Sequence, residues 1–186
     1  MSIFRECVEM GYKHVIPMGY DHILFILALF FFNSKLKTAV IQCSVFTVAH
    51  SLTLALVSCG FFNINTAFIE SVIALSIFFV AFENTISKKL NPWRLVLVFI
   101  FGLVHGVGFA SALNEFGIPR QEFVPALLGF NLGVELAQVS IILFCYFLIA
   151  KWSMDKPWYR NRLVIPVSLG ISCIGLFWTI ERFLSN

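Results

Sequence analysis

Apolar residues occur along the chain in six long runs that are separated by short polar connections. A helix needs about 20 mostly apolar residues to cross the hydrocarbon core of a bilayer, and each run approaches that length. The pattern therefore predicts an all-α polytopic membrane protein, a bundle of six transmembrane helices forming a single domain over residues 1–186. The helices are expected at about 15–32, 37–59, 65–83, 93–114, 122–150 and 163–181.

Basic residues in or beside the connections predict the orientation of the bundle. Nine of the thirteen Lys and Arg residues lie around the first, third and fifth connections: Lys35, Lys37, Lys88, Lys89, Arg94, Lys151, Lys156, Arg160 and Arg162. Cytoplasmic loops are enriched in Lys and Arg, so both termini are expected on the extracytoplasmic side. We expect a multi-pass protein of the cell's inner (plasma) membrane, with the lipid bilayer as its surroundings.

The composition agrees with this class and disfavours others. Of the 186 residues, 59% are hydrophobic and 12% are charged, against about 25% charged in an average soluble domain. The net charge of +3 is not gathered on one helix face, so no nucleic acid partner is expected. The first residues carry charge but no apolar stretch, so no cleavable signal peptide is expected. Five scattered cysteines without CxxC spacing predict neither a disulfide framework nor a thiolate metal site.

Three histidines lie inside the apolar runs. His22 is near the outer end of the first predicted helix, while His50 and His105 lie roughly 12–14 Å below the outer ends of the second and fourth. Asp21 precedes His22, and Glu135 reaches a similar depth in the fifth helix. A charged residue at the centre of a transmembrane helix costs roughly 2.5–3.5 kcal/mol on insertion scales, so such residues usually serve a function.

We interpret these five residues as ligands of one divalent metal ion, in a polar cavity open to the outside. Four further residues are expected to support the site: Glu70, Ser51, Asn131 and Gln138. Imidazole and carboxylate without thiolate favour Ni²⁺, Co²⁺ or Zn²⁺. Gly102 and Gly106 in the fourth predicted helix, and Gly129 and Gly133 in the fifth, have the spacing that permits close helix contact. We expect these two helices to touch, which would bring His105 and Glu135 together.

Four sequence blocks resemble the signature blocks of the HupE/UreJ family, in particular its second branch. They are GYKHVIPMGYDHILFIL, FTVAHSLTLAL, FGLVHGVGFASAL and FNLGVELAQ, in the first, second, fourth and fifth predicted helices. Members of the wider family are regarded as nickel or cobalt permeases associated with hydrogenase and urease maturation. The resemblance implies a functional role for His14, Asp21 and His22 and so adds His14 to the expected ligands. In the permease branch the proline directly follows the histidine, whereas here two residues separate His14 from Pro17.

Two functions from different classes remain open at this point. The first is a nickel- or cobalt-type permease that captures ions from the outside. The second is an intramembrane zinc-dependent hydrolase acting on a lipid or a membrane peptide, with Asp21 or Glu135 as the general base. The inner half of the fourth helix is apolar from Leu95 to Phe101, which leaves an ion little visible route onward. A scaffold whose histidines stabilise helix packing, and association as a homo-oligomer, also stay open.

Overall fold

The computed structural model describes residues 2–61, 66–87, 89, 91–115 and 120–185. All regular secondary structure in these residues is helical, which confirms the all-α class. The long helices are α1 (Ile3–Val15), α2 (Tyr20–Asn33), α3 (Leu36–Ser58), α4 (Thr66–Ile86), α5 (Trp93–Glu115), α6 (Phe123–Cys145) and α8 (Ile165–Leu184). Short turns join them: η1 (Arg120–Glu122), η2 (Tyr146–Ala150), α7 (Lys151–Ser153) and η3 (Arg160–Val164). Lys88 and Asn65, where the third helix was expected to begin, lie outside the described residues.

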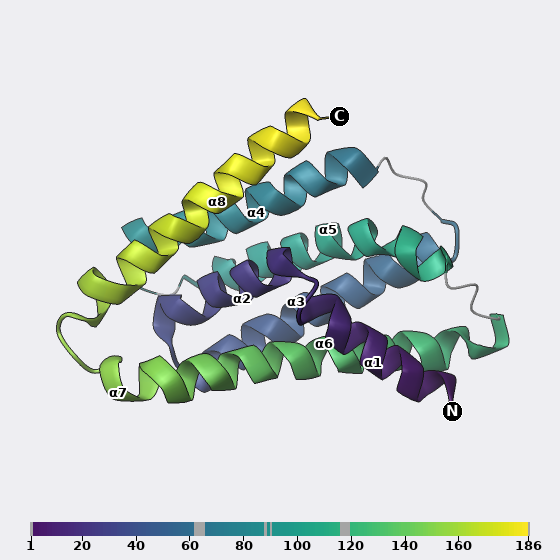
Figure 1. The fold of residues 1–186 in the computed structure, drawn as a ribbon, viewed down its shortest axis with the longest axis horizontal. Helices are drawn as coiled ribbons and strands as arrows, with labels where there is room; N and C mark the ends of the chain where they lie inside the picture. Colours follow the sequence, from purple (N-terminus) through teal and green to yellow (C-terminus); the bar gives the residue numbers. More distant parts are fainter. Residues whose placement is uncertain (1, 62–65, 88, 90, 116–119, 186) are drawn as a thin grey trace.

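The helices lie lengthwise beside one another, as Figure 1 shows, in the manner of a membrane bundle. Four of the described helices are long and apolar enough to cross a membrane: Leu36–Ser58, Phe68–Ile86, Phe123–Ser153 and Arg160–Leu184. A fifth span is present if α1 and α2 together form one broken crossing, and Trp93–Gly108 is a shorter apolar helix. These lengths identify a multi-pass membrane protein, while the count of six spans and the side of the termini stay predictions.

The N-terminal helix α1 was not expected from the apolar pattern. It is bent by 72° relative to α2, and the break holds Pro17 and Gly19. A proline cannot continue the hydrogen-bond ladder of a helix, so α1 ends just before it. A side chain at Gly19 would overlap the backbone oxygen of His14. The tight bend places His14, at the end of α1, beside His22 in the first turn of α2.

Glycines determine which helices touch most closely. A Cβ atom at Gly102 on α5 would lie 2.6 Å from the Phe46 oxygen of α3, and one at Gly129 on α6 would lie 2.5 Å from the Phe4 oxygen of α1. The close contacts are therefore α5 on α3 and α6 on α1. The expectation that these glycines join α5 to α6 is wrong, because α1, which the apolar pattern did not predict, occupies the glycine face of α6.

Gly106 offers a direct test of the α3–α5 contact. A methyl group there would overlap the His50 carbonyl oxygen and the Thr53 hydroxyl, so Gly106→Ala should destabilise the protein by about 1–3 kcal/mol through overpacking. Thermal unfolding in detergent should show a lower midpoint. Gly170→Ala on α8 is the matched control, because a methyl group there meets nothing within 4 Å. Equal midpoints for the two variants would contradict the close contact.

Candidate metal centre

Four histidines from four helices meet inside the bundle. His14 lies in the last turn of α1 and His22 in the first turn of α2. His50 lies near the middle of α3 and His105 near the middle of α5. The ring centre of His22 lies 4.7 Å from that of His14, 5.8 Å from that of His50 and 5.2 Å from that of His105. The rings of His14 and His50 are 6.2 Å apart. His22 is therefore the centre of the group, which we call the histidine cluster.

Several ring nitrogens of the cluster are buried without a hydrogen-bond partner. The exposed fractions of His22, His50 and His105 are 7%, 0% and 1%. The nitrogens without a partner are Nε2 of His22, Nδ1 and Nε2 of His50, and Nδ1 of His105. A buried polar atom that lacks a partner costs about 1–3 kcal/mol. Such a concentration of unsatisfied imidazole nitrogens is the strongest sign of a ligand site in the molecule.

Ser76 on α4 determines which nitrogen of His105 is available. The Ser76 hydroxyl donates to the backbone oxygen of Ile73 at 2.7 Å, and its oxygen lies 3.1 Å from Nε2 of His105. A serine hydroxyl has one proton, so toward His105 it acts as an acceptor and Nε2 carries the hydrogen. The lone pair of a neutral His105 is therefore on Nδ1, the atom without a partner.

Phenylalanines surround the cluster. The Phe46 ring centre lies 4.9 Å from that of His105 and 5.8 Å from that of His22. Phe130 stacks against His50 at 6.5 Å, and Phe25 lies 5.3 Å from His105. Rings of this size keep water from the inner side of the cluster, so a charge bound there interacts strongly with the imidazoles.

A cavity of about 1210 Å³ leads to the cluster. It lies where α2 and α4 begin and α8 ends, the side that the charge pattern predicts to be extracytoplasmic. Its lining includes His14, His22 and His105 together with four acidic residues and two basic ones: Glu6, Glu9, Asp21, Glu70, Lys13 and Arg182. His50 is not among the lining residues and lies deeper.

Asp21 lies at the cavity but is held by an arginine. Both carboxylate oxygens of Asp21 accept hydrogen bonds at 3.1 Å from one terminal nitrogen of Arg182 on α8. The other terminal nitrogen of Arg182 donates to the backbone oxygen of Glu70 at 3.1 Å, while the Glu70 residue itself is exposed. In this conformation Asp21 is the ion-pair partner of Arg182.

Glu135 belongs to a separate polar group between α3 and α6. The hydroxyls of Ser44 and Thr47 each donate to one of its carboxylate oxygens at 2.7 Å, and the Thr47 hydroxyl lies 3.1 Å from Oε1 of Gln138. The other two expected supporting residues bond to their own helices, Asn131 to the Leu127 oxygen at 2.8 Å and Ser51 to the Thr47 oxygen at 2.6 Å. Glu135 is not a lining residue of the cavity.

In this conformation, the described part of the chain contains no group of three or more His, Cys, Asp or Glu side chains arranged to hold a metal ion. The four imidazoles are gathered, but their nitrogens do not point to one centre. The roles of the predicted ligands therefore stay predictions.

A comparison with known families matches residues 1–182 to the family described as HupE / UreJ protein. The chain belongs to the HupE/UreJ family. Neither a curated protein nor a solved structure matches it. The family match covers all four members of the histidine cluster and both members of the Asp21–Arg182 pair.

The sequence analysis did not predict a role for Arg182 or Ser76 at this site. Arg182 is 161 positions away from Asp21, and no local pattern joins them. One signal was present: Arg182 is a single basic residue near the end of the last apolar run. A charge at that place calls for an acidic partner at the same depth.

The Ser76 contact predicts the tautomer of His105 in metal-free protein. Nitrogen-15 NMR of the histidine rings should show a hydrogen on Nε2 of His105. Ser76→Ala removes the acceptor and should mix the two tautomers or shift the population toward hydrogen on Nδ1. Ser71→Ala, which removes a buried hydroxyl of the same helix that has no partner, should leave the spectrum unchanged. A wild-type ring with hydrogen on Nδ1 would contradict the assignment.

Proposed function

We propose that this protein is a divalent metal permease of the nickel/cobalt type, and that the histidine cluster binds the ion in transit. The supporting observation is the meeting of four imidazoles from four helices at the base of an open cavity, in a member of the HupE/UreJ family. On this proposal the metal is cargo, and the acidic residues at the cavity mouth raise its local concentration.

The spacing of the rings suits an ion after small side-chain rotations. Zinc-type metals lie about 2.0–2.1 Å from an imidazole nitrogen, which puts tetrahedral ring centres roughly 5 Å apart. The centre-to-centre distances from His22 to the other three rings, 4.7, 5.8 and 5.2 Å, are close to that value, whereas the rings of His14 and His50 are 6.2 Å apart. Turning the rings, with His14 and His50 moving closer together, would direct lone pairs to one point. Imidazole ligands without thiolate suit Ni²⁺, Co²⁺ or Zn²⁺.

The contacts of the two expected carboxylate ligands also bear on the choice between the two functions. Two carboxylates expected in the first shell are engaged elsewhere, Asp21 with Arg182 and Glu135 with Ser44 and Thr47. The same contacts weaken the hydrolase alternative, because they engage both of the carboxylates that were expected to act as the general base.

Uptake into proteoliposomes tests the proposal. Radioactive nickel or cobalt should accumulate above empty vesicles, and His50→Ala or His105→Ala should lower the initial rate at least about tenfold, as loss of a metal ligand or its support does. Ser140→Ala is the control, because its hydroxyl bonds the Leu136 oxygen of its own helix at 2.8 Å.

No uptake above empty vesicles would overturn the permease proposal. If elemental analysis of the same preparation then found one firmly held zinc ion per chain, a resident metal and the hydrolase reading would gain support.

A further inference from the structure

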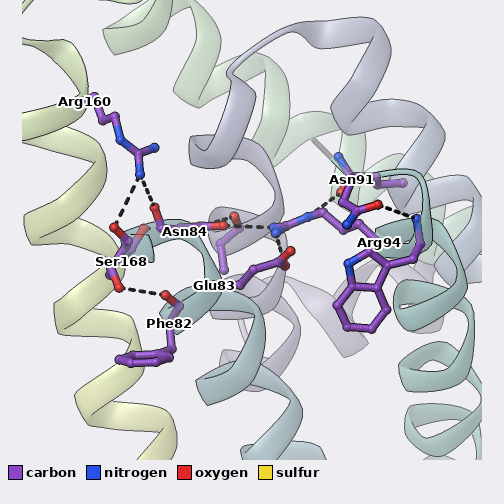
Figure 2. A network of polar contacts seen from close by, with 11 residues as sticks. Phe82, Glu83, Asn84, Asn91, Arg94, Arg160 and Ser168 are labelled. Atoms are coloured by element: carbon purple, nitrogen blue, oxygen red, sulfur yellow. Dashed lines mark hydrogen bonds and ion pairs between the residues drawn. The ribbon is translucent and has the colours of Figure 1, made fainter. Parts of the chain in front are cut away.

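A second polar group lies at the opposite end of the bundle, around Arg94 in the first turn of α5. Arg94 has an exposed fraction of 1%. Its Nε donates to Oε1 of Gln42 on α3 at 3.1 Å, and a terminal nitrogen donates to Oδ1 of Asn84 on α4 at 3.0 Å. The other terminal nitrogen forms an ion pair with Glu83, also on α4. Figure 2 shows Glu83 and Asn84 reaching toward this guanidinium.

Two of the three oxygens around Arg94, those of Asn84 and Gln42, are held in place by other contacts. The amide nitrogen of Asn84 donates to the Ala28 oxygen at 2.7 Å and to the Ser168 hydroxyl at 3.2 Å, so its oxygen must face Arg94. The amide nitrogen of Gln42 donates to the Thr38 oxygen at 3.3 Å. The two amide oxygens would therefore keep their directions if the guanidinium left. Together with the Glu83 carboxylate they offer three oxygens to a cation.

Packing needs alone do not account for this group. A buried ion pair is often no more stable than apolar side chains of the same volume, because both charges lose their hydration. Here one cation is surrounded by a carboxylate, two amide oxygens and the face of Phe32, whose centre lies 4.4 Å from the guanidinium carbon. Each of these groups is one that binds cations.

The place of this group relative to the histidine cluster suggests a route. Eleven residues of α5 separate Arg94 from His105, roughly 16 Å along the helix. On α3, Cys43 and His50 are seven residues apart and share the buried face. Thr47, with Gln138 and Glu135 beside it, lies between these levels.

We propose that Glu83, Gln42 and Asn84 form a second, oxygen-lined cation site at the inner end of the protein, and that Arg94 occupies it while the inner end is closed. The inference rests on the proposed permease function and identifies the place where the transported ion leaves the protein. An ion leaving the histidine cluster takes these three oxygens only after Arg94 has moved away, because the two positive charges repel. Oxygen ligands bind nickel and cobalt less strongly than imidazoles do, so the ion is released there.

Cobalt binding tests the site directly, without transport. Two variants are compared in a His50→Ala, His105→Ala background: Arg94→Gln, which empties the site and keeps Glu83, and Arg94→Gln with Glu83→Gln, which removes the carboxylate as well. Isothermal titration of detergent-purified protein with cobalt chloride should give one additional bound ion for the first variant. Equal binding by both variants would overturn the proposal.

Cys43 reports whether Arg94 closes the inner end. It is 1% exposed, and the other cysteines can be replaced by Cys7→Ala, Cys59→Ala, Cys145→Ala and Cys173→Ala. In metal-free nanodiscs, a charged maleimide should label Cys43 at least about tenfold faster when Arg94→Gln and Glu83→Gln are combined, because local opening becomes easier. The swapped pair Glu83→Arg with Arg94→Glu should return the slow rate.

Arg160→Gln is the matched control for labelling. Arg160 bonds the Asn84 and Thr85 backbone oxygens at 3.1 and 3.4 Å but not Glu83, so its loss loosens the same helix end without opening the site. Labelling that stays slow in the double variant, or rises equally in Arg160→Gln, would overturn the closing role. Neither cobalt binding nor Cys43 labelling depends on transport. If metal uptake fails, these two measurements can therefore still support or overturn the inner site on their own.

Discussion

The contact of Gly106 with the backbone of His50 is the constraint on which the histidine cluster depends. Within a bilayer, helices gain little from hydrophobic association and rely on close packing at small residues. Gly102 and Gly106 let α5 approach the Phe46 and His50 carbonyls of α3, and the Thr53 hydroxyl adds a hydrogen bond of 2.7 Å to the Leu103 oxygen. His105 is next to Gly106 in the chain, so the same contact that joins the helices brings His105 to the level of His50.

The two ends of the bundle are built differently around this pair of helices. At the open end, charged side chains line a wide cavity and the Asp21–Arg182 ion pair remains partly exposed. At the other end, Arg94 is buried and bonds to three buried side chains, those of Glu83, Asn84 and Gln42. An arginine therefore holds a carboxylate at each end of the bundle. The histidine cluster thus lies at the base of the cavity at the open end.

Much of this arrangement was readable from the chain, and the exceptions have physical reasons. The apolar runs identify the helices, and residue counts along them place His50 and His105 at one depth, because helix rise is constant. Which helix packs against which is harder to predict from the sequence. The spacing of Gly129 and Gly133 indicates a close contact but not which helix makes it. The apolar pattern missed α1 because the exposed Glu6, Glu9 and Lys13 interrupt its apolar residues. The Asp21–Arg182 and Glu135–Ser44 pairs join distant parts of the chain, so only the packing reveals them.

The bend between α1 and α2 divides the cluster into two mechanical halves. His50 and His105 belong to helices locked backbone to backbone, whereas His14 ends a helix whose main neighbour is α6, since Gly11, Gly129 and Gly133 all lie at that contact. His14 is thus carried by α6 through α1, and α6 also carries Glu135. A displacement of α6 against α3 would draw one imidazole out of the cluster while the locked pair stayed in place. The separations between the histidine rings would then change with the position of α6 and α1 relative to α3 and α5.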